Sequence, residues 1–249
     1  MIKKKMIKNG MKRGKAKGGC LVVCSGGLDS TVALYDALAN YAKVEAVTFH
    51  YGQNHEKREG AAVRRICKEA GVPLTEIDLG FIGRHFDSSL LKGAGAVPEG
   101  NYDSKNMAST VVPFRNGIML SVAVGLAASR KLAKVVLGNH GGDHFIYPDC
   151  RSEFIDAMCE AACHGTDGEV EVRSPFDGIT KADIVKIGAD LGVPFELTYS
   201  CYKGGKNHCG KCGTCRERRE AFERAGVPDP TKYDGKGELC PAKKKGGSR

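Results

Sequence analysis

A short string near the start of the chain has the residue types that bind phosphate groups. Ser25, Gly26 and Gly27 follow the apolar run 20–24, and a helical pattern begins near Asp29. Glycines let the backbone turn sharply and bring N–H groups close to an anion. The positive end of the following helix points at the same place. We therefore predict a nucleotide site formed by Cys24, Ser25, Gly26, Gly27, Leu28, Asp29, Ser30 and Thr31.

The acid inside this string needs an explanation, because Asp29 alone would repel a phosphate. One interpretation is that Asp29 caps the helix. The other is that Asp29 approaches the phosphates through Mg²⁺, an ion that is bound by carboxylates together with substrate phosphates. The second interpretation makes Asp29 a candidate catalytic residue and Mg²⁺ a cofactor that enters with the nucleotide.

Four cysteines near the end of the chain have the spacing of a metal site. Cys201, Cys209, Cys212 and Cys215 form the pattern C-x7-C-x2-C-x2-C, and the glycines between them permit tight turns. Four thiolates can close around one tetrahedral Zn²⁺ per chain, and such a site is structural because it leaves no open position. The alternative is an iron–sulfur cluster, for which Cys240 could supply a remote ligand.

The elements that must position these residues alternate between strand and helix. Apolar runs predict strands over 20–24, 44–49, 74–79, 134–138 and 169–173. Helical spacing predicts helices over 29–42, 56–70, 117–131, 151–163, 180–191 and 216–225. This alternation favours parallel βαβ units and an α/β fold with a five-stranded parallel sheet. Thr180 is the expected cap of its helix, with Asp183 at the third helical position, and residues 80–112 predict a long mobile loop with a functional role.

Composition narrows the class of protein. Hydrophobic residues make up 41% of the chain and charged residues 27%, as in ordinary globular proteins, so wholesale disorder is excluded. No apolar run is long enough to span a membrane, and the first twenty residues lack the apolar centre of a signal peptide. We therefore expect a cytoplasmic protein without membrane contact, in which clustered cysteines bind metal rather than form disulfides.

The positive charge is concentrated at the two ends. The formal net charge is +9, but residues 1–19 and 241–249 carry twelve basic residues and no acid, which leaves a net −3 for residues 20–240. Such ends are usually solvated and disordered. Basic tails can also contact nucleic acid weakly through its phosphates. The predicted organisation is a basic disordered tail over 1–19, a nucleotide-binding domain over 20–197, a metal-binding module with a C-terminal helix over 198–240 and a second basic tail over 241–249.

The string SGGLDS at residues 25–30 resembles the PP-loop of the N-type ATP pyrophosphatases. These enzymes cleave ATP between its α and β phosphates, usually while they adenylate an oxygen atom of the substrate. Together with the cysteine pattern, the string resembles the 7-cyano-7-deazaguanine (preQ0) synthase family of the queuosine and archaeosine pathways, over about residues 20–225. Four further strings carry this resemblance: AVTFHYGQNH at 46–55, VPFRN at 112–116, YPDCR at 147–151 and TKADIV at 180–185.

Two departures from the family pattern concern the substrate pocket. Tyr199 stands where the family usually has tryptophan, and residues 141–146 differ from the usual lead into YPDCR. These departures affect what can be expected of the shape of the substrate pocket, and the class of reaction does not depend on them.

The resemblance implies a Rossmann-like PP-loop ATP pyrophosphatase fold with a small C-terminal zinc-binding module. It implies a ligase that converts 7-carboxy-7-deazaguanine and ammonia to 7-cyano-7-deazaguanine. The acid and then the amide would be adenylated by ATP, with release of AMP and pyrophosphate. A homodimer is also implied.

The resemblance further assigns roles to individual residues. Arg115 and Lys181 are candidate cationic partners of the pyrophosphate and, with Asp29, complete the catalytic set. Arg115 and Asn116 are also expected at the substrate. Asp143 and Asp149 are candidates to accept the N–H and amine groups of the deazaguanine, with Asp149 preferred because it lies in a matching string. The adenosine would be held just after the second strand, by Tyr51, Gly52 and Gln53, with His55 beside them.

Two other functions compete with this interpretation. A PP-loop enzyme that modifies tRNA would explain the basic tails, although the body of the chain is net −3 and thiolating members usually need a catalytic cysteine pair. A non-catalytic zinc protein that binds nucleotide would retain both motifs without turnover.

Overall fold

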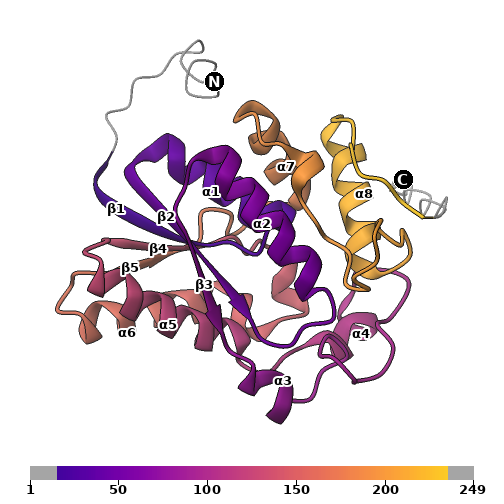
Figure 1. Cartoon of the computed structure of the whole chain (residues 1–249), viewed down its shortest axis with the longest axis horizontal. Coiled ribbons are helices and arrows are strands. Elements are labelled where there is room, and N and C mark those ends of the chain that lie inside the picture. Colours follow the sequence, from indigo (N-terminus) through magenta and orange to yellow (C-terminus); the bar gives the residue numbers. More distant parts are fainter. Residues whose placement is uncertain (1–15, 235–249) are drawn as a thin grey trace, which may run out of the picture.

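The computed structural model describes residues 16–234, and its centre is a parallel β-sheet (Figure 1). Within these residues the sheet has five strands in the order β3-β2-β1-β4-β5, and all neighbours are parallel. The strands are β1 (Ala16–Val23), β2 (Tyr41–His50), β3 (Leu74–Asp78), β4 (Lys134–Leu137) and β5 (Glu171–Arg173). The predicted five-stranded parallel sheet is thus confirmed. The strand order changes direction at β1, and ligands bind at such a switch point, beyond the carboxyl ends of the strands.

Helices cover both faces of the sheet (Figure 1). One face carries α1 (Leu28–Asn40), α2 (Glu56–Ala70), α7 (Lys181–Asp190) and α8 (Gly213–Ala225). The other face carries α5 (Arg115–Ser129) and α6 (Ser152–Gly165). Shorter helical turns are α3 (Phe81–His85), α4 (Ser104–Met107), η2 (Ala108–Thr110), η3 (Asp143–Phe145), η4 (Pro148–Cys150) and η5 (Phe195–Leu197). No helix in the described part of the chain is long and apolar enough to cross a bilayer.

The central strand, β1, shows why residues 20–24 form a continuous apolar run. In β1, Cys20 and Val22 belong to the core under α1 and α2, whereas Leu21 and Val23 belong to the core over α5 and α6. Successive side chains of a strand point to opposite faces. Because both faces are covered by helices, every position in the run is apolar.

Some element boundaries differ from the predicted ones. Strand β1 starts at Ala16, which pairs with Tyr41 in β2, so residues 16–19 belong to the sheet and not to the basic tail expected over 1–19. The first helix ends at Asn40, because Tyr41 already opens β2. The remainder of that tail, the tail expected over 241–249 and the cysteine at position 240 lie outside the described residues.

Other expectations hold, and one is wrong. Helix α2 has the predicted bounds, and Thr180 and Asp183 form a complete capping box at the start of α7. The segment 80–112 is not a structureless loop, since it contains α3, α4 and η2. Its short apolar stretches pack into the core through Ile82 and Leu90, which are buried.

The C-terminal segment shares the core of the sheet domain. The rings of Phe195 and Phe222 meet edge to face at 5.0 Å, and Phe222 lies on α8. Arg218, which is fully buried on the same helix, donates to Thr198 Oγ1 at 2.8 Å and to Ser200 Oγ at 3.1 Å. A buried guanidinium with several acceptors fixes its neighbours rigidly. Helix α8 is therefore held tightly against the connection that leads into the cysteines.

Candidate active site and metal centre

The connection from β1 to α1 forms a cradle of backbone N–H groups. Gly27 is the N-cap of α1, and no side chain bonds to the free N–H groups of its first turn. Gly26 has φ of 82°, and a Cβ atom there would lie 2.7 Å from the backbone nitrogen of Val63. Only glycine fits this position without a shift of the backbone. An uncapped helix start of this kind binds anions, so the geometry is that of a phosphate site.

The hydroxyl groups of the string hold this cradle in shape. Ser30 Oγ accepts the Ser25 N–H at 3.2 Å and lies 3.2 Å from Ser25 Oγ. Thr31 Oγ1 donates to the Gly27 carbonyl at 2.6 Å and is fully buried. Thr31 therefore stabilises the loop from behind, while Ser25 and Ser30 face the pocket.

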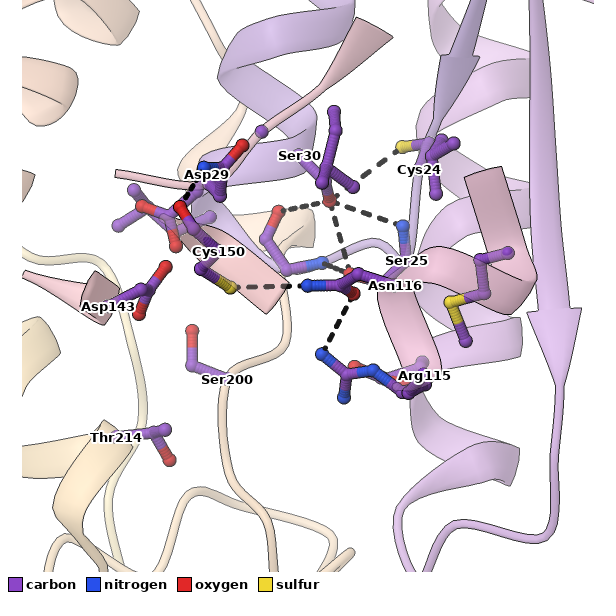
Figure 2. A pocket seen from close by; sticks show the side chains of 18 of the residues that line it. Cys24, Ser25, Asp29, Ser30, Arg115, Asn116, Asp143, Cys150, Ser200 and Thr214 are labelled. Atoms are coloured by element: carbon purple, nitrogen blue, oxygen red, sulfur yellow. Dashed lines mark hydrogen bonds between the residues drawn. The ribbon is translucent and has the colours of Figure 1, made fainter. Parts of the chain in front are cut away.

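A pocket opens at the carboxyl ends of β1, β2 and β4, and most of the predicted site residues meet in it (Figure 2). The predicted residues that line it are Cys24, Ser25, Gly27, Leu28, Asp29, Ser30, Tyr51, Gln53, His55, Arg115, Asn116, Asp143 and Lys181. The predicted residues outside its lining are Gly26, Thr31, Gly52 and Asp149. The nucleotide loop, the turn after β2 and the starts of α5 and α7 thus converge on one cavity.

Lys181, the first residue of α7, reaches the phosphate loop. Its Nζ lies 3.0 Å from Asp29 Oδ2 and 2.7 Å from Glu217 Oε2. Burial alone would lower the pKa of Lys181, but the carboxylates of Asp29, Glu217 and Asp143 outweigh burial and hold this pKa well above its usual value. The amine is therefore a permanent cation at the mouth of the helix cradle.

Arg115 supplies a second, partly buried cation to the lining of the pocket (Figure 2). Its guanidinium donates to Tyr51 Oη at 3.2 Å and to Asn116 Oδ1 at 3.3 Å, and its Nε has no partner among the described residues. Both acceptors are neutral at physiological pH. An arginine without a carboxylate partner can bind a carboxylate or phosphate of a ligand in a bidentate way.

The two candidate aspartates have different surroundings. Asp149 is buried, and its Oδ2 accepts the Asn116 backbone N–H at 2.8 Å, so it satisfies the start of α5. Asp143 lines the pocket, and its Oδ1 accepts the hydroxyl of Tyr102 at 2.7 Å. The geometry therefore favours Asp143 over Asp149 as a residue that contacts a ligand, the reverse of the preference drawn from the sequence.

Aromatic side chains that were not among the predicted site residues form part of the pocket wall. Tyr102, Tyr147 and Tyr202 all line it. The ring of Tyr202 stacks on His55 with centroids 5.1 Å apart, and burial raises the pKa of both Tyr102 and Tyr202 well above the usual value, so their hydroxyls stay protonated. Flat apolar walls with a few polar groups suit a heteroaromatic ligand. Tyr147 opens the string YPDCR, whereas Tyr102 and Tyr202 lie outside the strings that carry the resemblance.

Two acids also join the site without a sequence signal. Glu59, on α2, accepts from Gln53 Nε2 at 3.2 Å and lies 3.4 Å from His55 Nε2. Glu217, on α8, pairs with Lys181 and lies 3.6 Å from His140 Nε2. Neither acid lies in a recognisable string, because each reaches the site from the N-terminal part of an amphipathic helix.

The four predicted cysteines come together beside the pocket. Their sulfur atoms all lie within 4.8 Å of one another, and Cys209 Sγ is 3.9 Å from Cys215 Sγ. Four thiolates about 2.3 Å from one tetrahedral Zn²⁺ would be about 3.8 Å apart. Backbone N–H groups donate to the sulfurs, as Cys212 N–H does to Cys209 Sγ at 3.3 Å.

This arrangement fits a single ion. Ligands of an iron–sulfur cluster bind different irons and lie farther apart. The fourth ligand is supplied locally by Cys201, which is fully buried, so a distant cysteine is not needed to complete the set. Because all four positions are filled by protein, the ion would stabilise the fold and take no part in the reaction.

Comparisons with known proteins agree with these features. Residues 19–226 match the protein-family model described as queuosine biosynthesis protein QueC. A curated Porphyromonas gingivalis protein named 7-cyano-7-deazaguanine synthase is 53% identical over 215 residues, covering 86% of this chain and 97% of the relative. Proteins of the same name from Desulfotalea psychrophila and Rhizobium meliloti are 48% and 50% identical, over 86% of this chain and 97% and 91% of their own. The family match includes the phosphate loop, the pocket and all four cysteines.

Proposed function

This chain belongs to the QueC family of queuosine biosynthesis proteins, and we propose that its pocket converts 7-carboxy-7-deazaguanine to 7-cyano-7-deazaguanine with ATP and ammonia. It is a ligase, as the name of its curated relatives, 7-cyano-7-deazaguanine synthase, implies. The observation that carries the assignment of the pocket is the meeting of an uncapped helix start with two partly buried cations, Lys181 and Arg115. Such a site binds and polarises phosphates.

The chemistry requires two activations of the same carbon. A carboxylate is a poor electrophile, so one of its oxygens attacks the α-phosphate of ATP and pyrophosphate leaves. Ammonia then attacks the acyl-adenylate, AMP leaves and the amide forms. A second ATP adenylates the amide oxygen, and loss of AMP and two protons leaves the nitrile. Each nucleotide step needs donors placed where negative charge develops on the departing pyrophosphate.

The phosphate loop and Lys181 supply those donors. The free N–H groups at the start of α1 bind phosphate oxygens, and the Lys181 amine adds a full positive charge beside them. Asp29 Oδ1 is buried without a partner among the described residues, so it can bind a cation that accompanies ATP. Mg²⁺ would neutralise charge on the phosphates there. The adenosine lies against Tyr51 and Gln53, after β2.

The deazaguanine occupies the tyrosine-lined part of the pocket. Its carboxylate pairs with Arg115, whose Nε is free, and Asn116 lies beside it. Asp143, held by Tyr102, accepts the N–H and amine groups of the base. The acid to be activated is thereby held between Arg115 and the nucleotide.

The remaining components follow from the site and the family. The four cysteines hold one Zn²⁺ per chain as a structural ion. Ammonia is the nitrogen donor, the protein acts in the cytoplasm as a homodimer, and the basic tails make at most weak contacts with nucleic acid.

The direct test is AMP release by purified protein with MgATP, ammonium and 7-carboxy-7-deazaguanine, without RNA. AMP that depends on the acid, together with the nitrile in the products, is the expected result. ADP in place of AMP would contradict cleavage between the α and β phosphates. Turnover only after addition of tRNA would favour a tRNA-modifying enzyme. ATP binding without turnover with any acceptor would favour a non-catalytic protein.

A further inference from the structure

Glu217 lies behind the phosphate-facing lysine and has no assigned role. Its Oε2 is 2.7 Å from Lys181 Nζ, and both side chains are largely buried. On its other side, Glu217 Oε1 is 3.6 Å from Nε2 of His140. The Nδ1 of His140 accepts the Gly142 N–H at 3.0 Å, and its Nε2 faces Asp143 Oδ1 at the same distance of 3.6 Å. The close contact of Glu217 is therefore the one with the Lys181 amine, and His140 lies beside it without a hydrogen bond to Glu217.

The position of Glu217 is set by the cysteine cluster. Cys212 is the N-cap of α8 and Cys215 lies in the first turn of this helix, so two of the four thiols fix where the helix begins. Glu217 follows half a turn later on the same rigid helix. The buried side chain of Arg218 holds the same part of α8 to Thr198. The helix thus presents Glu217 to the nucleotide loop from a fixed base.

We propose that Glu217 is a positioning residue, which holds the Lys181 amine at the phosphate loop in register with the departing pyrophosphate. This inference rests on the proposed function, in which Lys181 contacts the phosphates. Glu217 itself touches no reacting atom and acts only through the lysine.

The geometry explains why a carboxylate is needed at this place. A lysine has a long flexible stem and a point charge with three donors, so it needs partners to fix its position. Lys181 Nζ donates to Glu217 Oε2 at 2.7 Å and forms an ion pair of 3.0 Å with Asp29 Oδ2, so the two carboxylates fix the amine and leave it a donor for a phosphate oxygen. Without Glu217 the Lys181 amine contacts Asp29 alone, and the two side chains can move together. Pre-organised charge is what gives such groups their effect on the rate.

The test compares Glu217→Gln and Glu217→Asp with a matched control, Glu220→Gln. Glu220 lies on the same helix and forms an ion pair of 3.6 Å with the exposed Arg224. The measurements are kcat and KM for ATP in the AMP-release assay, and the metal bound per chain. For Glu217→Gln we expect kcat to fall roughly tenfold, less than the 10²–10³ lost with a direct transition-state donor. KM for ATP should change less than about threefold, the metal content should stay unchanged, and Glu217→Asp should recover part of kcat.

A double variant separates positioning from general damage to the fold. If Glu217 acts only through the lysine, then Lys181→Ala with Glu217→Gln is no slower than Lys181→Ala alone. Multiplied losses in the double variant, a kcat for Glu217→Gln equal to that of Glu220→Gln, or a loss of bound metal would each overturn the inference. A fully active Lys181→Ala would instead overturn the proposed role of the lysine, so the two failures are distinguishable.

Discussion

Asp29 and Lys181 form an ion pair of 3.0 Å between the first turn of α1 and the first residue of α7. The structure excludes one of the two interpretations of the acid in the phosphate loop. Asp29 is not the helix cap, because that position belongs to Gly27, which leaves the helix start open. Instead Asp29 fixes the amine that stands in front of the open helix start, and its second oxygen, Oδ1, is buried without a partner among the described residues.

Replacement of Lys181 with alanine should abolish most of the activity. The variant keeps the pocket but removes the cation beside the phosphate loop, so kcat for AMP release should fall by about 10²–10³-fold. Steady-state kinetics with saturating ATP measure this change.

The matched control for this variant is Lys186→Ala. Lys186 lies on the same helix, is largely exposed and pairs with Asp183 at 3.6 Å. Its loss should leave kcat within about twofold, as expected for an exposed ion pair. Equal losses of kcat in the two variants would mean that both substitutions act by disturbing the fold of α7. The loss in Lys181→Ala would then not report the missing amine.

Asp29→Asn should stop AMP formation while the metal centre stays intact. The amide has the shape of the carboxylate, but it lacks the charge that orients Lys181 and receives a cation. We expect kcat to fall at least about a hundredfold, with the same metal content per chain as the unaltered protein. Unchanged turnover would place the nucleotide site elsewhere.

The two aspartates of the substrate region should respond differently to the same change. Asp143→Asn alters a group that lines the pocket, so it should raise KM for 7-carboxy-7-deazaguanine roughly tenfold or more with little effect on stability. Asp149→Asn weakens the acceptor for the Asn116 N–H, so it should lower the free energy of unfolding by about 1–3 kcal/mol. Kinetics and denaturant unfolding of both variants check this, and the opposite pattern would return Asp149 to the pocket.

The sequence predicts best what depends on neighbouring residues. The phosphate string, the apolar run of β1, the capping box at Thr180 and the cysteine spacing are all local, and each has the predicted structure. The cysteine spacing gives the ligand set because two short turns bring its thiols together. The two cations of the pocket, Arg115 and Lys181, also lie in local strings, VPFRN and TKADIV.

Contacts between distant elements could not be predicted in this way. Glu217 and Glu59 look like ordinary acids on amphipathic helices, and only the packing of those helices brings them to the site. Asp149 was preferred for its place in a string, yet its carboxylate is used by the backbone of another helix. Tyr102 lies in a segment that carries no periodic pattern, and its role depends on its bond to Asp143.

Loss of one metal ligand should both release the ion and lower the thermal stability of the protein. Cys212→Ser keeps a good N-cap residue at the start of α8, so its effects report the lost thiolate and not a lost cap. The bound metal should fall well below one ion per chain, and Tm should fall by roughly 10 °C if the site contributes several kcal/mol. Metal analysis and thermal unfolding measure both quantities. Cys159→Ser, in a partly exposed cysteine of α6 outside the cluster, is the control and should change neither.

Glu76, in the edge strand β3, should make the stability of the protein depend on pH. Its carboxylate accepts two hydrogen bonds from Arg64 and one contact of 2.8 Å from His50, the last residue of β2 before the pocket turn. The Arg64 bonds, against some burial, lower the pKa of Glu76 from 4.5 to about 2. Because the folded value is the lower one, the contribution to stability is complete above about pH 4.5 and is lost as the pH falls toward 2.

Glu76→Gln should therefore lower the free energy of unfolding at pH 7 by about 1 kcal/mol, a value reduced from the full shift because Arg64 is exposed. At pH 3 the difference from the unaltered protein should shrink to less than about half. Urea unfolding at the two pH values measures it, with Glu69→Gln on the exposed side of α2 as the control. A loss of equal size at both pH values would show that Glu76 acts through its shape and not through its charge.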